Sequence, residues 1–330
     1  MTKSKGQVCY TDREVIAMKG KHIIWGIVLG WLIPFAFLWP VSRQKDSALP
    51  TGTQGTYTQP SELTAKSVAV LQENGKVNEM EAEEYLVGVV LGEIPAGFHN
   101  EALKAQAVVA RTFTYKAIKT GKKHTQADVC TDPGCCQAYC DPTTYLSNKG
   151  SSSHLSAVRN AVAQTANMVL YYNGDLIEAT YFSCSGGRTE DAVAVWGADV
   201  PYLQSVESPG EEMAEHYMDT VHIPLQEFMT ALGLSGTMVT VENIRYSRGG
   251  GVDKITINAV EFTGGQMRSA LGLRSTAFVL TALPDKIMIT TRGFGHRVGM
   301  SQYGAQAMAE KGSDYREILS HYFPGTELSQ

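Results

Sequence analysis

The sequence predicts an α+β fold, because helical and strand patterns alternate along it without a regular βαβ rhythm. Two helical patterns follow one another between residues 78 and 119. Strand pairs joined by Asn-Gly and glycine-rich turns come later in the chain. Residues 65–330 are long enough for one large domain, and we expect a two-lobed domain of mixed helices and antiparallel hairpins with a substrate groove.

The first element is an apolar segment, residues 22–39, which contains no Asp, Glu, Lys or Arg. Its length just suffices to cross the ~30 Å hydrocarbon layer. Five Lys or Arg residues precede it and only two follow closely, so we expect residues 1–21 to form a cytoplasmic tail. A cleaved signal peptide is the alternative, but the run is long and lacks a small-x-small cleavage site. We predict a single-pass membrane anchor, a flexible linker at 40–64, and an extracytoplasmic domain.

The charge balance narrows the classes of partner. The first 21 residues hold five basic and two acidic of the chain's 28 basic and 33 acidic residues, which leaves a net charge of -8 for the remainder. An acidic extracytoplasmic part argues against nucleic acid or an anionic lipid surface as its partner.

A strand at 67–71 leads into the predicted helix 78–93. Asn78 is a suitable N-cap, and Pro95 forces the helix to stop near Glu93. The apolar stripe of this helix consists of Tyr85, Leu86, Val89 and Val90. Glu93 continues the stripe in the last turn, where dehydration and the helix dipole both disfavour a carboxylate. Glu93 is therefore a candidate general acid; the alternative is a solvated Glu at a helix end.

Asn100 is the predicted cap of a second helix, residues 101–119, which Gly121 closes. One face of this helix, rich in Leu and Ala, is expected to pack in the core. Another face of the same helix carries basic and hydroxyl groups, and such a face is normally solvated. Because the first helix ends only a few residues earlier, that face could meet Glu93 across a tight turn. The substrate-binding candidates on it are Lys104, Arg111 and Tyr115.

Hairpin signals dominate the rest of the chain. Asn173-Gly174 separates two strand patterns, and a second turn follows at 248–251. The predicted strands are 168–172, 175–182, 241–246, 252–260 and 286–291.

Two loops carry groups suited to a sugar. The first is a hydroxyl-rich turn at 183–189, in which Ser185 is a substrate-binding candidate. The second is the glycine-bearing loop 293–299 and the start of the helix after it, which let backbone approach a bulky ligand. Its candidates are His296, Ser301, Gln302 and Tyr303. Alternatively, His296 bonds to its own loop and Ser301 caps the following helix.

Cysteines are concentrated between residues 124 and 140. We interpret His124, Cys130, Cys135 and Cys136 as ligands of a closed, structural zinc site, which leaves Cys140 over. A disulfide is the alternative, because the compartment can be oxidising.

Four segments resemble, in order, the stage II sporulation protein D family: residues 86–95, 101–112, 181–187 and 293–305. The resemblance covers about residues 65 to 328, and the same domain occurs in proteins that modify peptidoglycan amidases. The chain departs from the family at Cys184, where Thr is frequent, and at Arg297, where Gly is frequent.

The resemblance implies a membrane-anchored lytic transglycosylase, facing the space between the sporulation membranes. Such an enzyme cuts the β-1,4 bond between N-acetylmuramic acid and N-acetylglucosamine during engulfment. It implies that Glu93 is the catalytic acid/base and that the His/Cys loop binds zinc. It also implies two partners, the sporulation amidase (stage II sporulation protein P) and the membrane protein stage II sporulation protein M. The amidase would strip the stem peptides first, so that bare glycan is the substrate.

Two other functions remain open from the sequence. One is a non-catalytic glycan-binding module that activates a cell-wall amidase. The other is a zinc hydrolase with an open metal position, although neither Gly-x-Ser-x-Gly nor His-Glu-x-x-His occurs in the chain.

Overall fold

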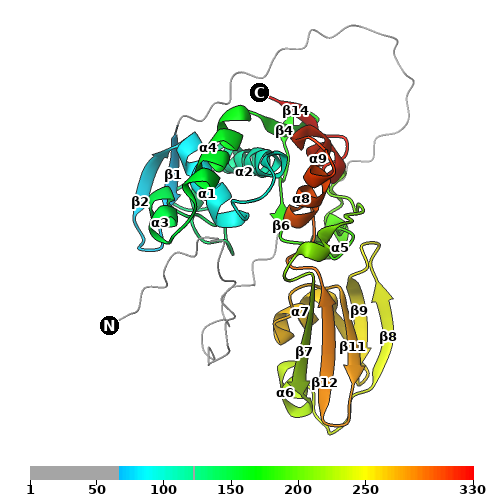
Figure 1. The fold of residues 1–330 in the computed structure, drawn as a ribbon. Coiled ribbons are helices and arrows are strands. Elements are labelled where there is room, and N and C mark those ends of the chain that lie inside the picture. Colours follow the sequence, from blue (N-terminus) through cyan, green and yellow to red (C-terminus); the bar gives the residue numbers. More distant parts are fainter. Residues whose placement is uncertain (1–66, 122) are drawn as a thin grey trace, which may run out of the picture. The chain divides into compact units, whose positions relative to one another are not determined.

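The computed structural model describes residues 67–121 and 123–330 (Figure 1). The predicted tail, anchor and linker, residues 1–21, 22–39 and 40–64, lie outside these ranges and stay predictions. None of the helices within the described ranges combines the length and apolar character that a membrane-spanning helix needs.

The α+β prediction is confirmed by the order of elements along the chain. The helices are α1 (Ala82–Glu93), α2 (Asn100–Thr120), α3 (Pro142–Ser147), α4 (Ser152–Gln164), α5 (Ala192–Trp196), a 3-10 turn η1 (Glu211–Met213), α6 (Leu225–Ala231), α7 (Gly264–Leu271), α8 (Gln302–Glu310) and α9 (Tyr315–Tyr322). The strands are β1 (Ser67–Leu71), β2 (Val77–Glu81), β3 (Val129–Cys130), β4 (Val169–Tyr172), β5 (Asp175–Leu176), β6 (Tyr181–Phe182), β7 (Met218–Pro224), β8 (Val241–Tyr246), β9 (Val252–Ile257), β10 (Val260–Thr263), β11 (Phe278–Ala282), β12 (Lys286–Arg292), β13 (Met300–Ser301) and β14 (Glu327–Ser329).

The described strands form small sheets in the orders β2-β1-β3, β14-β4-β5, β13-β6, β10-β9-β8 and β11-β12-β7. Most pairs are antiparallel, as predicted. The exceptions are β1 with β3 and β6 with β13, which pair in parallel. Both parallel pairs join segments that are far apart in the sequence, and both lie beside the cavity described below.

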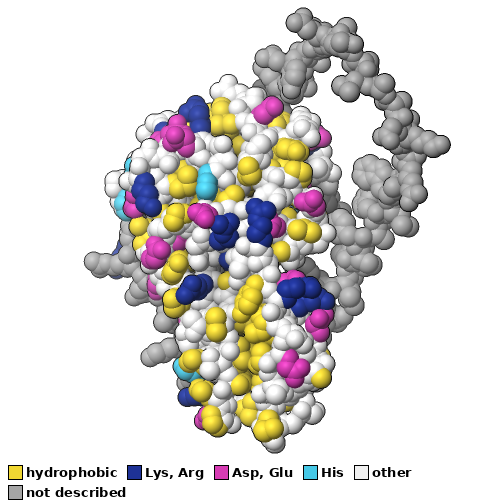
Figure 2. All heavy atoms as spheres, turned by 90° about the vertical axis from the view of Figure 1, so that its right-hand side faces the viewer, with side chains coloured by type: hydrophobic (Ala, Val, Ile, Leu, Met, Phe, Trp, Pro, Cys, Tyr) yellow, Lys and Arg dark blue, Asp and Glu magenta, His cyan; other side chains and the backbone are white. Residues whose placement is uncertain are grey.

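Three hydrophobic clusters form the core. The first surrounds α1 and packs it against α2 and α4, and the second packs α2 against α8, α9 and β4. The third lies within residues 221–289, where α6 and α7 cover the sheets of that region. Residues 218–292 also expose several large hydrophobic side chains, and Figure 2 shows such side chains gathered over the lower part of one face.

The structure corrects both predicted helix starts. Helix α1 begins at Ala82 rather than Asn78, because residues 77–81 pair with β1 as strand β2. Glu81 is the N-cap and accepts a hydrogen bond from the backbone of Glu84 at 2.7 Å. Helix α2 is capped by His99 instead of Asn100. Helix α1 does end at Glu93, as the following Pro95 predicts.

The predicted solvated face of α2 is also wrong. This helix lies between the first and second clusters, so both of its faces are covered along most of its length. Arg111 and Tyr115 are buried together with the Leu and Ala face. A single-sequence pattern shows one apolar face, but it does not show that a second core covers the other.

The predicted hairpins are confirmed with shorter second strands. Asn173 and Gly174 both adopt positive φ angles, 51° and 82°, as a tight turn between β4 and β5 requires. Strand β5 ends at Leu176, and the chain then continues to β6 in another sheet. The predicted strand 252–260 is divided by a turn into β9 and β10. Strands 67–71 and 286–291 are confirmed, the latter with one further residue.

Candidate active site around Glu93

A cavity of about 750 Å³ opens at the C-terminal end of α1. Most of its lining comes from the end of α1, the cysteine-rich loop, strand β6 with its neighbours, and the loop before β13, and the β1–β2 turn, α2 and α8 contribute one residue each. The lining residues include Glu73, Gly92, Glu93, Phe113, Thr131, Cys136, Ala138, Tyr139, Tyr181, Phe182, Ser183, Phe294, Gly295, His296 and Gln302. A wall that combines several aromatic rings with a few polar groups is typical of a site for a small ligand or a short saccharide.

Two hydrogen bonds hold the carboxyl of Glu93 in this cavity. Its Oε1 accepts the backbone N–H of Ala138 at 2.6 Å, and the hydroxyl of Tyr181 donates to it as well. The Tyr181 oxygen in turn accepts from Gln137 Nε2 at 3.2 Å, and Thr114 on α2 donates to Gln137 Oε1 at 2.9 Å. A chain of buried side chains thus fixes the direction in which the carboxyl points.

The surroundings of Glu93 favour its protonated form. Burial raises the pKa of this carboxyl, and the bonds from Ala138 and Tyr181 offset only part of that increase. This is the dehydration that the position at the end of the apolar stripe predicts. Burial also raises the pKa of Tyr181 well above its usual range, so its hydroxyl remains a donor. A partly dehydrated carboxyl facing a cavity can act as a general acid near neutral pH.

Gln302 is the second predicted residue that meets Glu93. Its Nε2 donates to the backbone carbonyl of Glu93 at 3.0 Å, and its side chain also lines the cavity. The bond ties the first residue of α8 to the last residue of α1, two helices more than 200 positions apart. Gln302 therefore positions the end of α1 that carries the acid.

His296 lies in the wall of the cavity and is held by its own loop. The backbone N–H of Val298 donates to its Nδ1 at 3.2 Å, which agrees with the alternative interpretation of this residue. Its ring also contacts Phe182 and Trp196, with centroid separations of 5.6 and 5.4 Å. Burial, and after it the nearby Arg268, lower the pKa of His296 to about 4. A neutral imidazole offers stacking and hydrogen bonding rather than charge.

Ser185 and Ser301 lie in a different environment from the one that was predicted. Both are fully buried, and both donate their hydroxyl groups to the carboxylate of Glu211. Ser301 is also the N-cap of α8, as the alternative interpretation states. These two side chains have no exposed surface that a substrate could contact. Through Glu211 they join the 183–189 turn to the start of α8.

Glu211 is the structural residue that the sequence did not reveal. Its Oε2 accepts from the backbone of Ser185 and Gly186, both at 2.8 Å, and its Oε1 accepts from Ser208 at 2.7 Å. Glu211 stands beside Glu212 in an acidic pair of ordinary appearance. Only the fold shows that one member of the pair is buried among so many donors.

Arg111 has structural partners in place of a substrate. Its guanidinium is 0% exposed and binds Glu83 through Nε at 2.8 Å and Nη2 at 2.6 Å. Further bonds reach the carbonyls of Val162 and Met168. This corrects the prediction that Arg111 faces substrate, because a two-pronged buried ion pair leaves its donors engaged.

The remaining predicted side chains are not among the residues that line the cavity. Lys104 forms an ion pair with Glu101 at 2.7 Å and lies over the ring of Tyr315. Tyr115 packs in the first hydrophobic cluster, and Tyr303 contacts the ring of Phe98 edge-on. Among the predicted site residues in the described chain, only Glu93, His296, Gln302 and Cys136 line the cavity.

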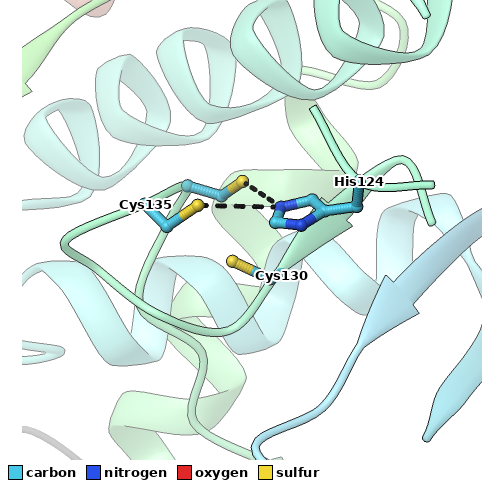
Figure 3. Close-up of side chains that lie close together, drawn as sticks. His124, Cys130 and Cys135 are labelled. Atoms are coloured by element: carbon cyan, nitrogen blue, oxygen red, sulfur yellow. Dashed lines mark hydrogen bonds between the residues drawn. The ribbon is translucent and has the colours of Figure 1, made fainter. Parts of the chain in front are cut away.

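The predicted metal ligands come together. One donor atom from each of His124, Cys130, Cys135 and Cys136 lies within 4.8 Å of the other three. Figure 3 shows the imidazole of His124 directed toward the sulfur atoms, with Nε2 at 3.3 Å from Cys136 Sγ and 3.7 Å from Cys135 Sγ. Tetrahedral zinc with bonds of roughly 2.0–2.3 Å needs donors separated by about this distance. The donor set fits zinc, and the three cysteines are free thiols.

The ligand loop also forms part of the cavity. Cys136 lines it, Gln137 bonds to Tyr181, and Ala138 donates to the Glu93 carboxyl. Cys140 is buried nearby and does not belong to the four-donor cluster. With four protein donors the site has no open position, which disfavours the zinc hydrolase.

The chain is similar to known sporulation proteins. The profile of the family described as Stage II sporulation protein (SpoIID) matches residues 71–172. The chain is 36% identical to Stage II sporulation protein D of Bacillus amyloliquefaciens, over 92% of this chain and 93% of that protein. It is 35% identical to the protein of the same name from Bacillus subtilis, over 91% and 92%.

A more distant relative has a different name. The chain is 30% identical to a Bacillus subtilis protein named Amidase enhancer, over 74% of this chain and 40% of that protein. Identity of more than a third over nearly the whole length of both chains is decisive for the first two relatives, so this chain belongs to the stage II sporulation protein D family.

Proposed function

We propose that this protein is a lytic transglycosylase that cleaves the β-1,4 bond between N-acetylmuramic acid and N-acetylglucosamine in peptide-free glycan strands during sporulation. The observation that carries the proposal is the Glu93 carboxyl: it faces a cavity of about 750 Å³, and burial raises its pKa. Membership of a sporulation family supports cell-wall glycan as the substrate.

One carboxyl suffices for the proposed reaction. Protonated Glu93 donates its proton to the glycosidic oxygen as the bond from C1 of the muramic acid to that oxygen breaks. The carboxylate then accepts the proton of the 6-hydroxyl of the same sugar, whose oxygen bonds to C1 and closes a 1,6-anhydro ring. Glu93 is thereby returned to its protonated form, and no water is consumed. Because the attacking hydroxyl belongs to the same sugar, its effective concentration is high.

Neighbouring side chains support both protonation states of Glu93. The donors from Ala138 and Tyr181 remain in place when the carboxyl is ionised, and they stabilise the carboxylate that follows the first proton transfer. Gln302 holds the end of α1 through its bond to the Glu93 carbonyl. Neutral His296 and the surrounding aromatic rings provide an apolar wall for a sugar.

We propose a structural role for zinc, held by His124, Cys130, Cys135 and Cys136. A closed zinc site supplies a cross-link between loop segments when it is bound and takes no part in proton transfer. In this chain the cross-linked loop is the one whose Ala138 and Gln137 orient Glu93 and Tyr181.

A second function has one observation in its favour. Glu73, in the turn between β1 and β2, is a second carboxylate that lines the cavity. Ordinary glycosidases use two carboxylates and water, so Glu73 and Glu93 together could serve hydrolysis. Glu73 is exposed, however, whereas Glu93 is held by two donors.

The name of the more distant relative suggests a third function, a glycan-binding activator of an amidase without catalysis of its own. In this case the cavity would hold glycan, and Glu93 would serve only as a hydrogen-bonding group.

Mass spectrometry of peptide-free glycan in H₂¹⁸O separates the three functions. Lytic cleavage gives 1,6-anhydro ends without ¹⁸O, and hydrolysis gives reducing ends that carry ¹⁸O. We expect anhydro products from the wild type and from Glu73→Gln, and none from Glu93→Gln. Reducing ends labelled with ¹⁸O would contradict lytic cleavage and show that the protein is a hydrolase. Intact peptide-free glycan, together with faster amidase cleavage of peptide-bearing peptidoglycan in a parallel assay, would replace it by the activator function.

We also propose two partner proteins and a membrane location. An amidase that removes stem peptides, such as stage II sporulation protein P, would prepare the substrate. Stage II sporulation protein M would be the membrane partner. Residues 22–39 would anchor the chain in the mother-cell membrane, with the domain facing the intermembrane space.

A further inference from the structure

An exposed tryptophan lies next to the cavity without belonging to its lining. Trp196 is the last residue of α5 and is 47% exposed, although large aromatic side chains usually bury most of their surface. Its ring contacts His296 at a centroid separation of 5.4 Å, and His296 contacts Phe182 at 5.6 Å. His296 and Phe182 both line the cavity around Glu93. These three rings form a continuous aromatic path from the cavity wall to solvent.

Several bonds fix the segment that leads to Trp196 relative to that wall. The backbone of Glu190 donates to the carbonyl of Arg297 at 2.6 Å, immediately after His296. The side chains of the same two residues form a buried ion pair at 3.1 Å. Asp191 accepts the backbone N–H of Ser205 at 2.7 Å, and Gly197 ends α5 in a left-handed conformation. The segment that carries Trp196 and the loop that carries His296 are therefore held together before any ligand arrives.

Arg297 makes this connection possible despite an unfavourable backbone. Its φ is 66°, a region that favours glycine. The guanidinium offsets the strain by donating to Ser185, Arg188 and Gly249 carbonyls as well as to Glu190. These bonds join the loop that carries His296 to residues 185–190, the segment that leads into α5.

We infer that Trp196 is a sugar-stacking platform, which binds a further sugar of the same glycan strand whose cleaved bond lies at Glu93. The inference rests on the proposed function for its substrate class. A pyranose ring has apolar C–H faces, and these pack against an exposed aromatic face with little loss of conformational entropy. A glycan strand extends beyond the cavity and needs further binding groups there. The aromatic path from Phe182 through His296 leads to Trp196, which is such a group.

The chain offers a direct spectroscopic test. Its four tryptophans are Trp25, Trp31, Trp39 and Trp196. In the full-length protein, the first three tryptophans are changed to Phe, and Glu93→Gln prevents cleavage. The tryptophan fluorescence of this variant then comes from Trp196 alone. Titration with peptide-free glycan strands of eight sugars should shift its emission saturably and protect it from acrylamide. A disaccharide, which is too short to reach both sites, should have a much smaller effect.

Affinity measurements complete the test. By calorimetry with Glu93→Gln protein, Trp196→Ala should weaken binding of the eight-sugar strand about tenfold, or ~1.4 kcal/mol, and leave disaccharide binding unchanged. Trp196→Phe should retain most of the affinity. Val279→Ala, at a position 64% exposed on β11, is the matched control and should bind like the parent.

Calorimetry separates failure of this inference from failure of the proposed function. Tight glycan binding that leaves Trp196 emission and quenching unchanged, and that Trp196→Ala does not weaken, would overturn the platform alone. Absence of glycan binding to the parent protein would overturn both the platform and the proposed function.

Discussion

Glu93 and Glu211 are two carboxylates in the same part of the molecule with opposite surroundings. Glu211 is fully buried and accepts from three serine hydroxyl groups and from the backbone of the 185–187 turn. Glu93 accepts from two donors, Ala138 and Tyr181, and faces a cavity. A carboxylate surrounded by donors is a stable anchor, whereas one with few donors and little water keeps its proton more readily. The number of hydrogen-bond donors thus distinguishes Glu211, which has a structural role, from Glu93, which can act as a general acid.

The two sites also differ in how they are held. Glu211 joins segments through hydrogen bonds alone, which form when the chain folds. One donor to Glu93, Ala138, belongs to the loop that carries the metal-ligand side chains, and the other, Tyr181, accepts a hydrogen bond from Gln137 of the same loop. We therefore expect the geometry around Glu93 to depend on an ion, and that around Glu211 to be independent of one.

The largest expected effect is the loss of the Glu211 carboxylate. Glu211→Gln places an amide against donors that already converge on this position, so that buried groups lose their partners. We expect a loss of about 3–5 kcal/mol of unfolding free energy, measured by urea denaturation. Glu212→Gln alters the exposed neighbour and is the matched control. Equal stability of the two variants would show that the Glu211 bonds contribute little.

Removal of zinc is expected to have the next largest effect. A chelator should release one zinc per chain, measured with a colorimetric indicator, and lower glycan cleavage at least tenfold, with recovery on adding zinc back. Cys130→Ser should act in the same way, whereas Cys184→Ala, outside the four-donor cluster, should retain the metal. Full activity in metal-free protein would show that the geometry around Glu93 does not depend on a metal ion in this loop.

Some parts of the site follow from the sequence alone, and others follow only from the fold. Glu93, the end of α1 and the four metal ligands were predicted, because each depends on short-range spacing: a helix stopped by Pro95, or donors within 13 residues. Arg111, Ser185 and Ser301 were given the wrong partners. Their partners Glu83 and Glu211 lie 28, 26 and 90 positions away, and no local pattern marks such pairs. Trp196 was missed because its position beside His296 depends on the pairing of Glu190 with Arg297.

A smaller effect concerns stability and pH. Burial raises the folded-state pKa of Glu93 above the ordinary 4.5. Its contribution to stability is therefore fully present below 4.5 and is lost as the pH rises through the folded-state pKa. Glu93→Gln should be more stable than wild type at neutral pH, and the advantage should disappear below about pH 4.5. Denaturation at several pH values measures this, and a difference that does not vary with pH would contradict a raised pKa.

The smallest expected effect is that of Tyr181→Phe, which sharpens the comparison by removing one of the two donors to Glu93. Because the Tyr181 hydroxyl lowers the pKa of Glu93, its loss should raise that pKa further. The general acid then stays protonated to higher pH, so the alkaline limb of kcat/KM should move upward. Activity at the optimum should fall about 2- to 10-fold, as for one lost hydrogen bond. Tyr139→Phe alters another cavity-lining tyrosine and should leave the limb in place. A downward shift in Tyr181→Phe would mean that this hydroxyl favours the protonated acid, and the two donors would then act in opposite directions.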